Sequence, residues 1–472
     1  MTSSKNPVIY WLREDFRVHD NLALTEAAKN NKNLILVYFN NYLDKQLGSA
    51  EELWINNSFL EIYKKYHEIY GIKIQCYEGD PIQYLEELRK RFGVSEIYAN
   101  EVYDPRIRKK DDKIKNHFID QITFKLYNSH LLFNPEEIKN NAGSYFKVYT
   151  PFWKNCLSKL TIRKPLRPPK EINIFQDKYL KDSCDFSFNR PLWAKKLLRY
   201  FTPGENAARL KLKELGSLIK GYSNNRDFPN KDSTSKFSMY FARGELSVNE
   251  VMYHLLKNKA KINKEDYIKF SSQIGWREFS YNILHNFSNL PLKNFNKKFD
   301  NFEWDTNKKN FNLWKLGQTG FPIVDAGMRE LYQTGYMHNR VRMISASFLV
   351  KDLLIDWRLG RKWFEETLLD HDIANNSAGW QWVAGSGTDA APYFRIFNPS
   401  LQSERFDKEG TYIKRWIPEL RDLPSKFIHS PWKFNESDLK KYNLELGKSY
   451  PYPMVDHANA RDKALMLYKK LK

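Results

Sequence analysis

Short apolar runs alternate with helical patterns over the first 130 residues. The β-rich runs are Val8–Leu12, Leu34–Phe39, Ile72–Tyr77, Glu96–Ala99 and Ile122–Leu126. Helical patterns separate them at Asn21–Lys29, Ala50–Tyr70, Pro81–Phe92 and Pro105–Phe118. This alternation is typical of a parallel sheet covered by helices, so we predict a Rossmann/flavodoxin-like α/β domain over residues 1–130. It holds no G-x-G-x-x-G, so the fold pattern alone predicts no dinucleotide site there.

The periodicity changes twice beyond this domain. It fades between Leu131 and Leu192, where several prolines interrupt the chain, so we interpret residues 131–192 as a long interdomain linker. From Trp193 to Lys472 the pattern is helical, which predicts a larger all-α domain over residues 193–472. Nine of the thirteen tryptophans lie from Trp276 onward, and this enrichment points to that domain for stacking chemistry.

The composition is that of a folded chain with an excess of positive charge. Hydrophobic residues make up 42% of it and aromatic residues 15%, which excludes a mainly disordered protein. Lysine and arginine number 76 against 56 acidic residues, which gives a net charge of +20. Such an excess suits a polyanion such as DNA, because each neutralised phosphate releases counterions. A generally lysine-rich surface is the alternative explanation.

Cysteine use and hydropathy set the expected location. The three cysteines, Cys76, Cys156 and Cys184, do not read as a disulfide framework, so we expect a reducing compartment. They are too few for an iron–sulfur cluster, and no Cys/His spacing resembles a zinc site, so we expect no metal. The sequence shows no signal peptide and no apolar stretch of about 20 residues, so we expect a soluble cytoplasmic protein.

Seven segments of the chain carry a specific resemblance to one family. They are Trp11–Leu24 (WLREDFRVHDNLAL), Arg226–Ser238 (RDFPNKDSTSKFS), Trp276–Phe279 (WREF), Thr319–Leu331 (TGFPIVDAGMREL), Met337–Arg358, His371–Trp382 (HDIANNSAGWQW) and Gly387–Asp407. In this order they resemble the DNA photolyase/cryptochrome family, and above all its class I cyclobutane-pyrimidine-dimer photolyases. The resemblance implies a helical FAD-binding domain and light-driven repair of ultraviolet-damaged DNA. In the first segment, we interpret Arg13, Asp15, Arg17 and Asp20 as a structural ion-pair network.

The FAD phosphates require hydroxyls, backbone N–H groups and helix N-termini. Thr234, Ser235 and Ser238 lie just before a helical run, where they suit either this purpose or plain N-capping. By resemblance, the phosphates are held by Thr234, Ser235, Lys236, Phe237 and Ser238, with Tyr222 nearby.

The flavin ring, held as a reduced anion in a dry pocket, requires compensating positive charge and fixed hydrogen bonds. The resemblance implies that Arg342 and Asp370 pair over the ring, although a purely structural pair is the alternative. It also implies that Asp372 contacts the flavin and that Asn376 faces its N5 atom. Plant cryptochromes place Asp at the position of Asn376, where it can protonate the flavin. An amide cannot, which favours a reduced, catalytic flavin.

Further roles also follow from the resemblance. Trp380, Trp357 and Trp314 match the tryptophan chain that carries electrons from the surface to the flavin, although three core tryptophans would show the same pattern. The lesion pocket needs apolar walls and polar groups that read flipped bases. Trp276 and Trp382 match its walls, and Asn339 and Met343 match the groups that contact the dimer. Arg226, Arg277, Arg340, Arg395 and Gln402 match DNA-contacting positions, while Arg277 and Asn339 also belong to the implied cofactor-binding set.

The chain departs from the family pattern at Gln273, where the family usually has Glu. Gln can hydrogen-bond the dimer but cannot protonate it, and (6-4) photolyases carry Gln there. However, (6-4) enzymes need two histidines at the positions of Asn339 and Met343, and neither residue transfers protons. Cyclobutane-dimer repair therefore stays the leading hypothesis, with a (6-4) photolyase as an alternative.

The second departure concerns the antenna chromophore. Folate-binding members carry Asn-Glu where this chain has Pro105-Arg106, which disfavours folate. The Tyr-x-Pro-x-x-Arg pattern looks more like relatives that bind a deazaflavin or FMN, and the absence of any antenna stays open. Two other functions also stay open: a cryptochrome-like blue-light photoreceptor, and a DNA-binding flavoprotein without repair activity. No protein partner is implied, so we expect a monomer.

Overall fold

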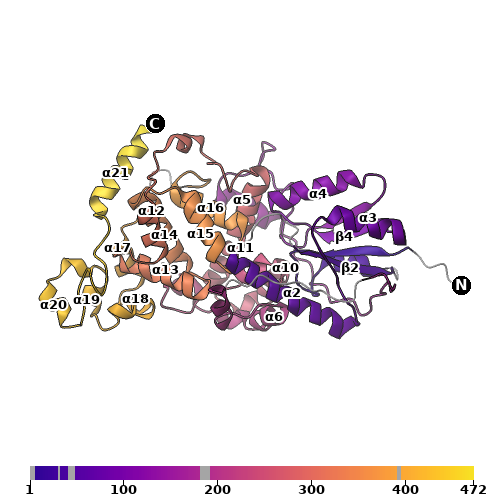
Figure 1. Cartoon of the computed structure of the whole chain (residues 1–472), viewed down its shortest axis with the longest axis horizontal. Coiled ribbons are helices and arrows are strands. Elements are labelled where there is room, and N and C mark those ends of the chain that lie inside the picture. The colour runs from indigo at the N-terminus through magenta and orange to yellow at the C-terminus, as the bar shows by residue number, and fades with distance from the viewer. Residues whose placement is uncertain (1–5, 30–31, 41–47, 181–191, 391–394, 472) are drawn as a thin grey trace.

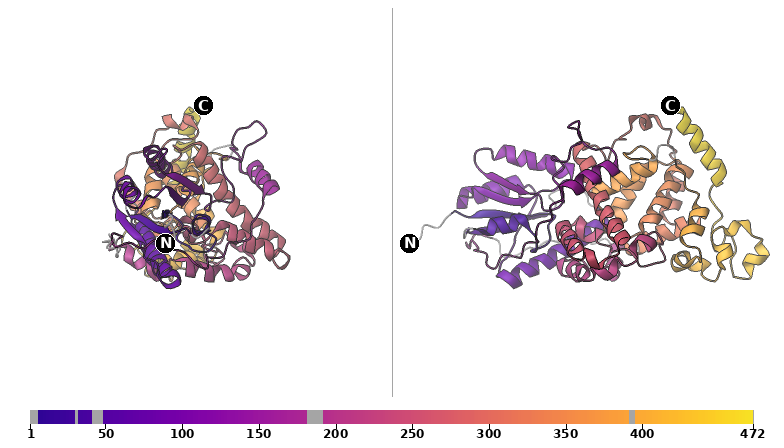
Figure 2. Two further views of the ribbon diagram at one scale, coloured as in Figure 1. Left: turned by 90° about the vertical axis from the view of Figure 1, so that its right-hand side faces the viewer. Right: turned by 180° about the vertical axis from the view of Figure 1, so that it is seen from behind.

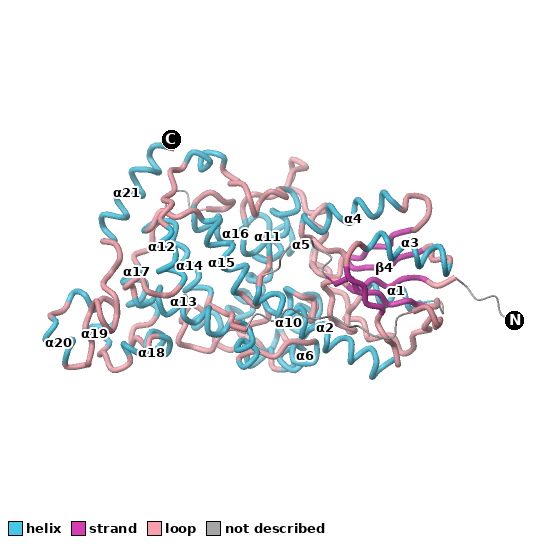
Figure 3. Tube along the Cα trace, in the orientation of Figure 1, coloured by secondary structure: helices cyan, strands magenta, loops and turns pink. Residues whose placement is uncertain are grey.

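The chain folds into a sheet-containing part and a helical part that lie end to end (Figures 1 and 2). This structure is a computed structural model that describes residues 6–29, 32–40, 48–180, 192–390 and 395–471. Strands are confined to one end of the molecule (Figure 3), as the change of periodicity predicts. Cys184 and Pro191 lie outside the described residues.

The sheet has five parallel strands in the order β3-β2-β1-β4-β5. The strands are β1 (Val8–Leu12), β2 (Leu34–Asn40), β3 (Gln75–Glu78), β4 (Glu96–Asn100) and β5 (Thr123–Tyr127). The helices between them are α1 (Leu22–Ala28), α2 (Ser49–Tyr70), α3 (Pro81–Phe92) and α4 (Pro105–His117). The predicted α/β fold is confirmed, with β3 starting three residues later than expected. Ile72 and Ile74 are buried, which explains the apolar run ahead of the ladder.

The loop after β1 joins the sheet to the helical part. Arg17 donates to the carbonyl of Gly244 (2.7 Å), and the N–H of Phe16 donates to the carbonyl of Arg243 (3.3 Å). Gly244 has a φ of +59°, and a Cβ there would lie 2.3 Å from the carbonyl oxygen of Glu14, so only glycine fits this close approach. Arg13 pairs with Asp111 and Asp20 with Arg163, so the ion pairs of this segment are made with partners outside it and not among its own four charged residues.

The linker contains a helix that the sequence analysis missed. This helix, α5 (Tyr149–Lys159), buries Phe152, Trp153 and Cys156. The three apolar positions at i, i+1 and i+4 were the available signal, but Pro151 and the nearby lysines obscured it. Packing against the helical part stabilises this short helix, because eleven residues are marginal on their own.

Sixteen helices follow α5 in the described part of the chain. They are α6 (Glu205–Lys213), α7 (Leu215–Leu218), α8 (Tyr222–Asn225), α9 (Ser238–Ala242), α10 (Val248–Lys257), α11 (Lys264–Asn286), α12 (Lys308–Lys315), α13 (Pro322–Thr334), α14 (Asn339–Ser347), α15 (Trp357–Thr367), α16 (Ile373–Ala384), α17 (Pro399–Phe406), α18 (Thr411–Trp416), α19 (Ser425–Ile428), α20 (Glu436–Lys440) and α21 (His457–Lys470). A π-helical turn, Phe348–Asp352, continues α14, and short 3₁₀ turns lie at Ala194–Arg199, Lys259–Lys261, Lys297–Asn301, Pro418–Leu420 and Pro431–Lys433. The predicted larger all-α part is confirmed.

One cysteine of the described part is a free thiol. Cys156 is buried in α5. No helix within the described ranges is long and apolar enough to cross a membrane.

Candidate functional site

A buried ion pair lies at the centre of the helical part. The carboxylate of Asp370 accepts two hydrogen bonds from Arg342 (3.0 and 2.9 Å) and one from the hydroxyl of Ser238 (2.7 Å). Burial lowers the pKa of Arg342, but the charge and hydrogen bonds of Asp370, together with Tyr336 and Glu330, leave the pKa raised, so the guanidinium stays charged. The structure thus brings together three residues assigned to FAD from the sequence.

The segment ahead of α9 carries the residues that the sequence assigns to the FAD phosphates. The hydroxyl of Thr234 lies 3.3 Å from that of Tyr336, and the N–H of Phe237 donates to Ser235 Oγ (3.4 Å). Lys236 has a φ of +55°, which is rare for a side chain of its size, and pairs with Asp232 (2.8 Å). Tyr222 is buried at the start of α8. The left-handed turn at Lys236 aligns successive backbone groups of this segment, an arrangement that suits an anion.

Two further predicted residues come from the N-terminal half of α16. Asp372 is its N-cap and accepts from the N–H of Asn375 (2.8 Å) and from the hydroxyl of Tyr281 (2.7 Å). Asn376 donates its amide N–H to the carbonyl of Arg361 (3.1 Å). This bond turns Asn376 Oδ1 away from Arg361, so the oxygen remains an acceptor for an N–H of a ligand.

Arg277 lies in a buried network rather than at the surface. Its guanidinium pairs with Glu278 (3.1 Å) and contacts His130 Nε2 (2.7 Å), and it lies 4.9 Å from the ring centroid of Tyr281. Burial lowers the pKa of His130 well below its usual value, so this ring is neutral. The position suits a residue that organises the cofactor pocket and does not suit a contact to a DNA phosphate.

The predicted tryptophan chain is only partly consistent with the structure. Trp380 and Trp314 lie 6.2 Å apart between ring centroids, and Trp357 donates to Asn294 (2.9 Å). All three are buried, and Trp314 is 0% exposed. Trp314 therefore does not provide the surface end that such a chain needs.

Trp304 meets that requirement and was overlooked in the sequence. It is partly exposed and precedes Asp305, which bridges to Ile355 just ahead of Trp357. Two tryptophans ten residues apart look alike in the sequence, and only their exposure separates them.

The predicted lesion residues lie on α11, α14 and α16 with partly open side chains. Trp276 and Trp382 are both partly exposed. Asn339 is exposed, and its amide lies 3.8 Å from Met343 Sδ one helical turn later. Gln273 donates to the carbonyl of Lys269 (3.2 Å) and to Ser272 Oγ (3.0 Å), so its amide lies along α11.

The residues predicted to contact DNA differ in whether a protein carboxylate lies beside them. Arg340 pairs with Asp227 (3.1 Å), and Arg226 lies near the same carboxylate (3.6 Å). Arg395 is exposed, and Gln402 is partly exposed on α17. A phosphate would therefore compete with Asp227 for the first two arginines, whereas Arg395 is accessible directly.

Buried polar groups without a partner support a bound cofactor. Ser377 Oγ and Trp380 Nε1 on α16, Arg361 Nε on α15 and Arg277 Nε on α11 are buried without a hydrogen-bond partner. Such orphaned groups are rare in a finished core. Two of them lie on α16, which also carries Asn376, and the other two lie on α15 and α11, which both contact α16, so the residues present fit a large polar ligand such as FAD.

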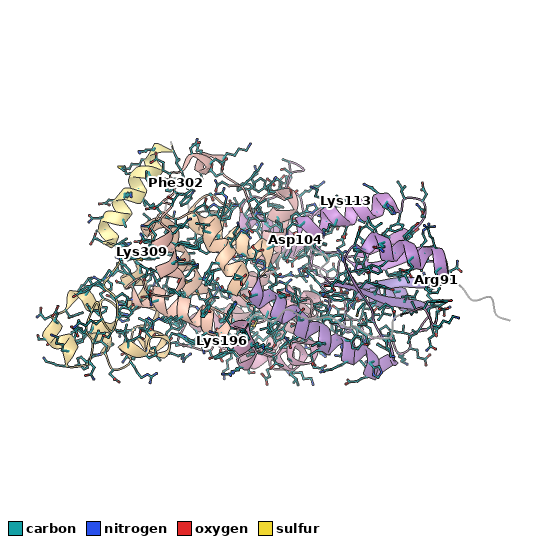
Figure 4. The ribbon with its side chains drawn as sticks, viewed as in Figure 1. Arg91, Asp104, Lys113, Lys196, Phe302 and Lys309 are labelled. Carbon is teal, nitrogen blue, oxygen red and sulfur yellow. The ribbon has the colours of Figure 1, made fainter. Side chains whose placement is uncertain are left out.

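Two cavities lie between the sheet and the helical part. One of about 390 Å³ is lined by Pro105 and Arg106 from α4 and by Leu292, Arg361 and Glu365 from the helical part. Arg106 is also ion-paired with Asp104, which Figure 4 labels at this boundary. The other cavity is polar and reaches Asp372, and burial there raises the pKa of Glu14 to about 6. The larger cavity coincides with the position where the sequence places an antenna.

Comparisons with known proteins define the family. Residues 8–170 match the family described as DNA photolyase, and residues 270–470 match the FAD binding domain of DNA photolyase. The chain is 41% identical to a protein from Agrobacterium fabrum named deoxyribodipyrimidine photo-lyase, covering 100% of this chain and 99% of that one. The chain therefore belongs to the DNA photolyase family, and FAD is its cofactor.

Two further comparisons show the range of this family. A solved structure described as a bacterial class III photolyase from Agrobacterium tumefaciens matches with a TM-score of 0.95 at 42% identity, over 100% of this chain and 98% of that one. This chain, whose motifs resemble those of class I photolyases, is thus also similar to a protein described as class III. Cryptochrome-1 of Arabidopsis thaliana is 34% identical, over 96% of this chain and 69% of that protein.

Proposed function

We propose that this protein uses FAD and light to split cyclobutane pyrimidine dimers in DNA. The observation that carries the proposal is the Arg342–Asp370–Ser238 cluster, because Arg342 lies on α14, which contacts the helix α16 that carries Asn376 and Trp380. When bound, reduced FAD supplies the dimer with one electron under blue light and regains it once the two carbon–carbon bonds of the ring have broken. The substrate class also favours the predicted cytoplasmic location.

The chain's own residues have distinct tasks in this proposal. Arg342 provides positive charge beside the flavin, and Asp370 keeps that guanidinium oriented. Asn376 offers a neutral acceptor and no acidic proton. Because these groups are already hydrogen-bonded within the protein, they need little rearrangement when the cofactor binds.

Trp380, Trp357 and Trp304 form the proposed route by which electrons reach oxidised FAD. Indole rings are oxidisable, and the partly exposed Trp304 gives the route an end in solvent. Trp314 touches Trp380 but is closed off from water, so it belongs to the packing around the route.

The lesion pocket favours cyclobutane dimers over (6-4) products. Trp276 and Trp382 provide apolar walls, and Asn339 can donate an amide hydrogen bond to a dimer carbonyl that gains negative charge. Gln273 can do the same once its amide leaves Lys269 and Ser272 Oγ. Chemistry on a (6-4) lesion needs a proton donor at Asn339 or Met343, and neither side chain supplies one.

The test uses oligonucleotides that carry one lesion of either kind. They are illuminated with blue light in the presence of chemically reduced protein and separated by chromatography. We expect repair of the cyclobutane dimer and none of the (6-4) product, with modestly faster repair by Gln273→Glu, because a charge-assisted hydrogen bond is worth about 1.5–3 kcal/mol against about 0.5–1.5 for a neutral one. Repair of the (6-4) product would overturn the substrate assignment.

A photoreceptor is the second candidate, supported by the similarity to Cryptochrome-1. The same assay separates the two, because light-dependent reduction of FAD without repair of either lesion would favour signalling. A mass spectrum of released chromophores tests whether a second chromophore occupies the cavity at Pro105 and Arg106.

A further inference from the structure

One face of Trp276 is already occupied by another aromatic ring. The ring of Tyr149 lies 3.7 Å from it between centroids, with an angle of 8° between the planes. Phe279 meets Trp276 edge-on at 5.9 Å. Trp276 is nevertheless partly exposed, so a flipped base can stack only on the face opposite Tyr149.

Tyr149 is itself held in place at two points. Its hydroxyl donates to the carbonyl of Ser272 (2.8 Å), one helical turn before Trp276 on α11. Its ring also meets Phe279 of α11 edge-on, at 6.0 Å between centroids.

The fit between α5 and α11 leaves no room for adjustment. Trp153 of α5 lies over Gly275, where an added Cβ would come within 2.5 Å of the indole ring. Close packing at the residue next to Trp276 keeps α5 from sliding along α11.

We infer that Tyr149 is a positioning residue that fixes the plane of Trp276 and thereby sets the preference for dimer-containing over undamaged DNA. This inference rests on the proposed function, since it takes Trp276 as a wall of the lesion pocket. A wall that is rigid before binding loses less conformational freedom when the lesion arrives.

The test measures dark binding to a duplex with one cyclobutane dimer and to the same duplex without it. We expect Tyr149→Leu to reduce the ratio of the two affinities by about 2- to 10-fold, the range of one aromatic stacking contact. Tyr149→Phe keeps the ring and should keep most of the ratio. Affinity for undamaged duplex and FAD content should stay unchanged in both variants.

Tyr332→Leu is the matched control. Tyr332 stacks on Trp193, with 5.1 Å between the ring centroids and 9° between the ring planes, and neither residue contributes to the proposed lesion pocket. Its loss should leave the ratio of the two affinities unchanged. In a Trp276→Ala background, Tyr149→Leu should cause no further loss, because its effect acts through the indole.

The outcomes separate this inference from the proposed function. If the unmodified protein does not discriminate between the two duplexes, the proposed function fails. If it discriminates and Tyr149→Leu keeps the full ratio, the positioning role is refuted. Loss of FAD in Tyr149→Leu but not in Tyr332→Leu would also refute it, because Tyr149 would then support the fold as a whole.

Discussion

Replacing Asp370 by Asn tests how the cofactor pocket is held together. The change keeps the size of the side chain and one acceptor oxygen but removes the charge opposite Arg342. Losing one partner of a buried ion pair costs about 3–5 kcal/mol. The Arg342 side chain is 22% exposed and still donates to the carbonyl of Met337 (2.7 Å). Partial solvation therefore reduces the expected loss to about 2–3 kcal/mol.

Thermal unfolding of the purified protein measures this loss. With an unfolding entropy of about 2.1 cal/mol/K per residue over 472 residues, 1 kcal/mol corresponds to about 1 °C, so the midpoint of Asp370→Asn should fall by about 2–3 °C, with weaker retention of FAD. Asp438→Asn is the control, since Asp438 pairs with Lys441 at the surface (2.8 Å) and its loss should leave the midpoint unchanged. Equal midpoints for the two variants would refute the reasoning, because the Asp370–Arg342 pair would then contribute no more to the free energy of unfolding than a surface pair.

Three further predictions test other parts of the molecule. Trp380→Phe should block light-driven reduction of bound FAD while chemically reduced protein still repairs DNA, and unchanged photoreduction would remove Trp380 from the route. Arg→Ala at one phosphate contact should flatten the log–log dependence of DNA binding on salt by about 0.7–0.9, and an unchanged slope at all three of Arg226, Arg340 and Arg395 would exclude them as contacts. Burial raises the pKa of Glu330 from 4.5 to about 7, opposed by a hydrogen bond from Tyr412, so stability present below pH 4.5 is lost as the pH rises through about 7. Glu330→Gln should therefore show a smaller fall in unfolding midpoint over this range, and an unchanged fall would contradict the assignment.

The sheet was predictable because its strands are short apolar runs separated by capped helices. Asp80 and Asp104 cap α3 and α4 through their own side chains, each followed by proline at the first helical position. The boundaries of α3 agree with the prediction at both ends. In contrast, α5 has no side-chain cap and is stabilised by contacts with α11, which is far from it in the sequence.

In the candidate site, too, features within one helix could be predicted from the sequence, whereas contacts between distant segments could not. Compact motifs on single helices identify residues, because helical spacing keeps Gln273 near Trp276 and Asn339 near Met343. Exposure and pairing depend on the fold, so the sequence did not show that Trp314 is closed to solvent or that Arg277 is buried beside Glu278. The contact between Tyr149 and Ser272 spans 123 residues and leaves no local pattern.

In the proposed function, the two tryptophans of α16 have separate tasks, one in electron supply and one in lesion binding. Asp372, Asn376 and Trp380 follow at intervals of four residues, so they lie along one side of the helix. Trp382 comes two residues after Trp380 and is therefore turned by about 200° around the helix axis. The proposal therefore assigns photoreduction and dimer binding to different sides of one helix. For this reason Trp380→Phe should leave the affinity for dimer-containing DNA unchanged, whereas Trp382→Ala should weaken that affinity without slowing photoreduction. A parallel loss of both activities in either variant would show that the two sides are not independent.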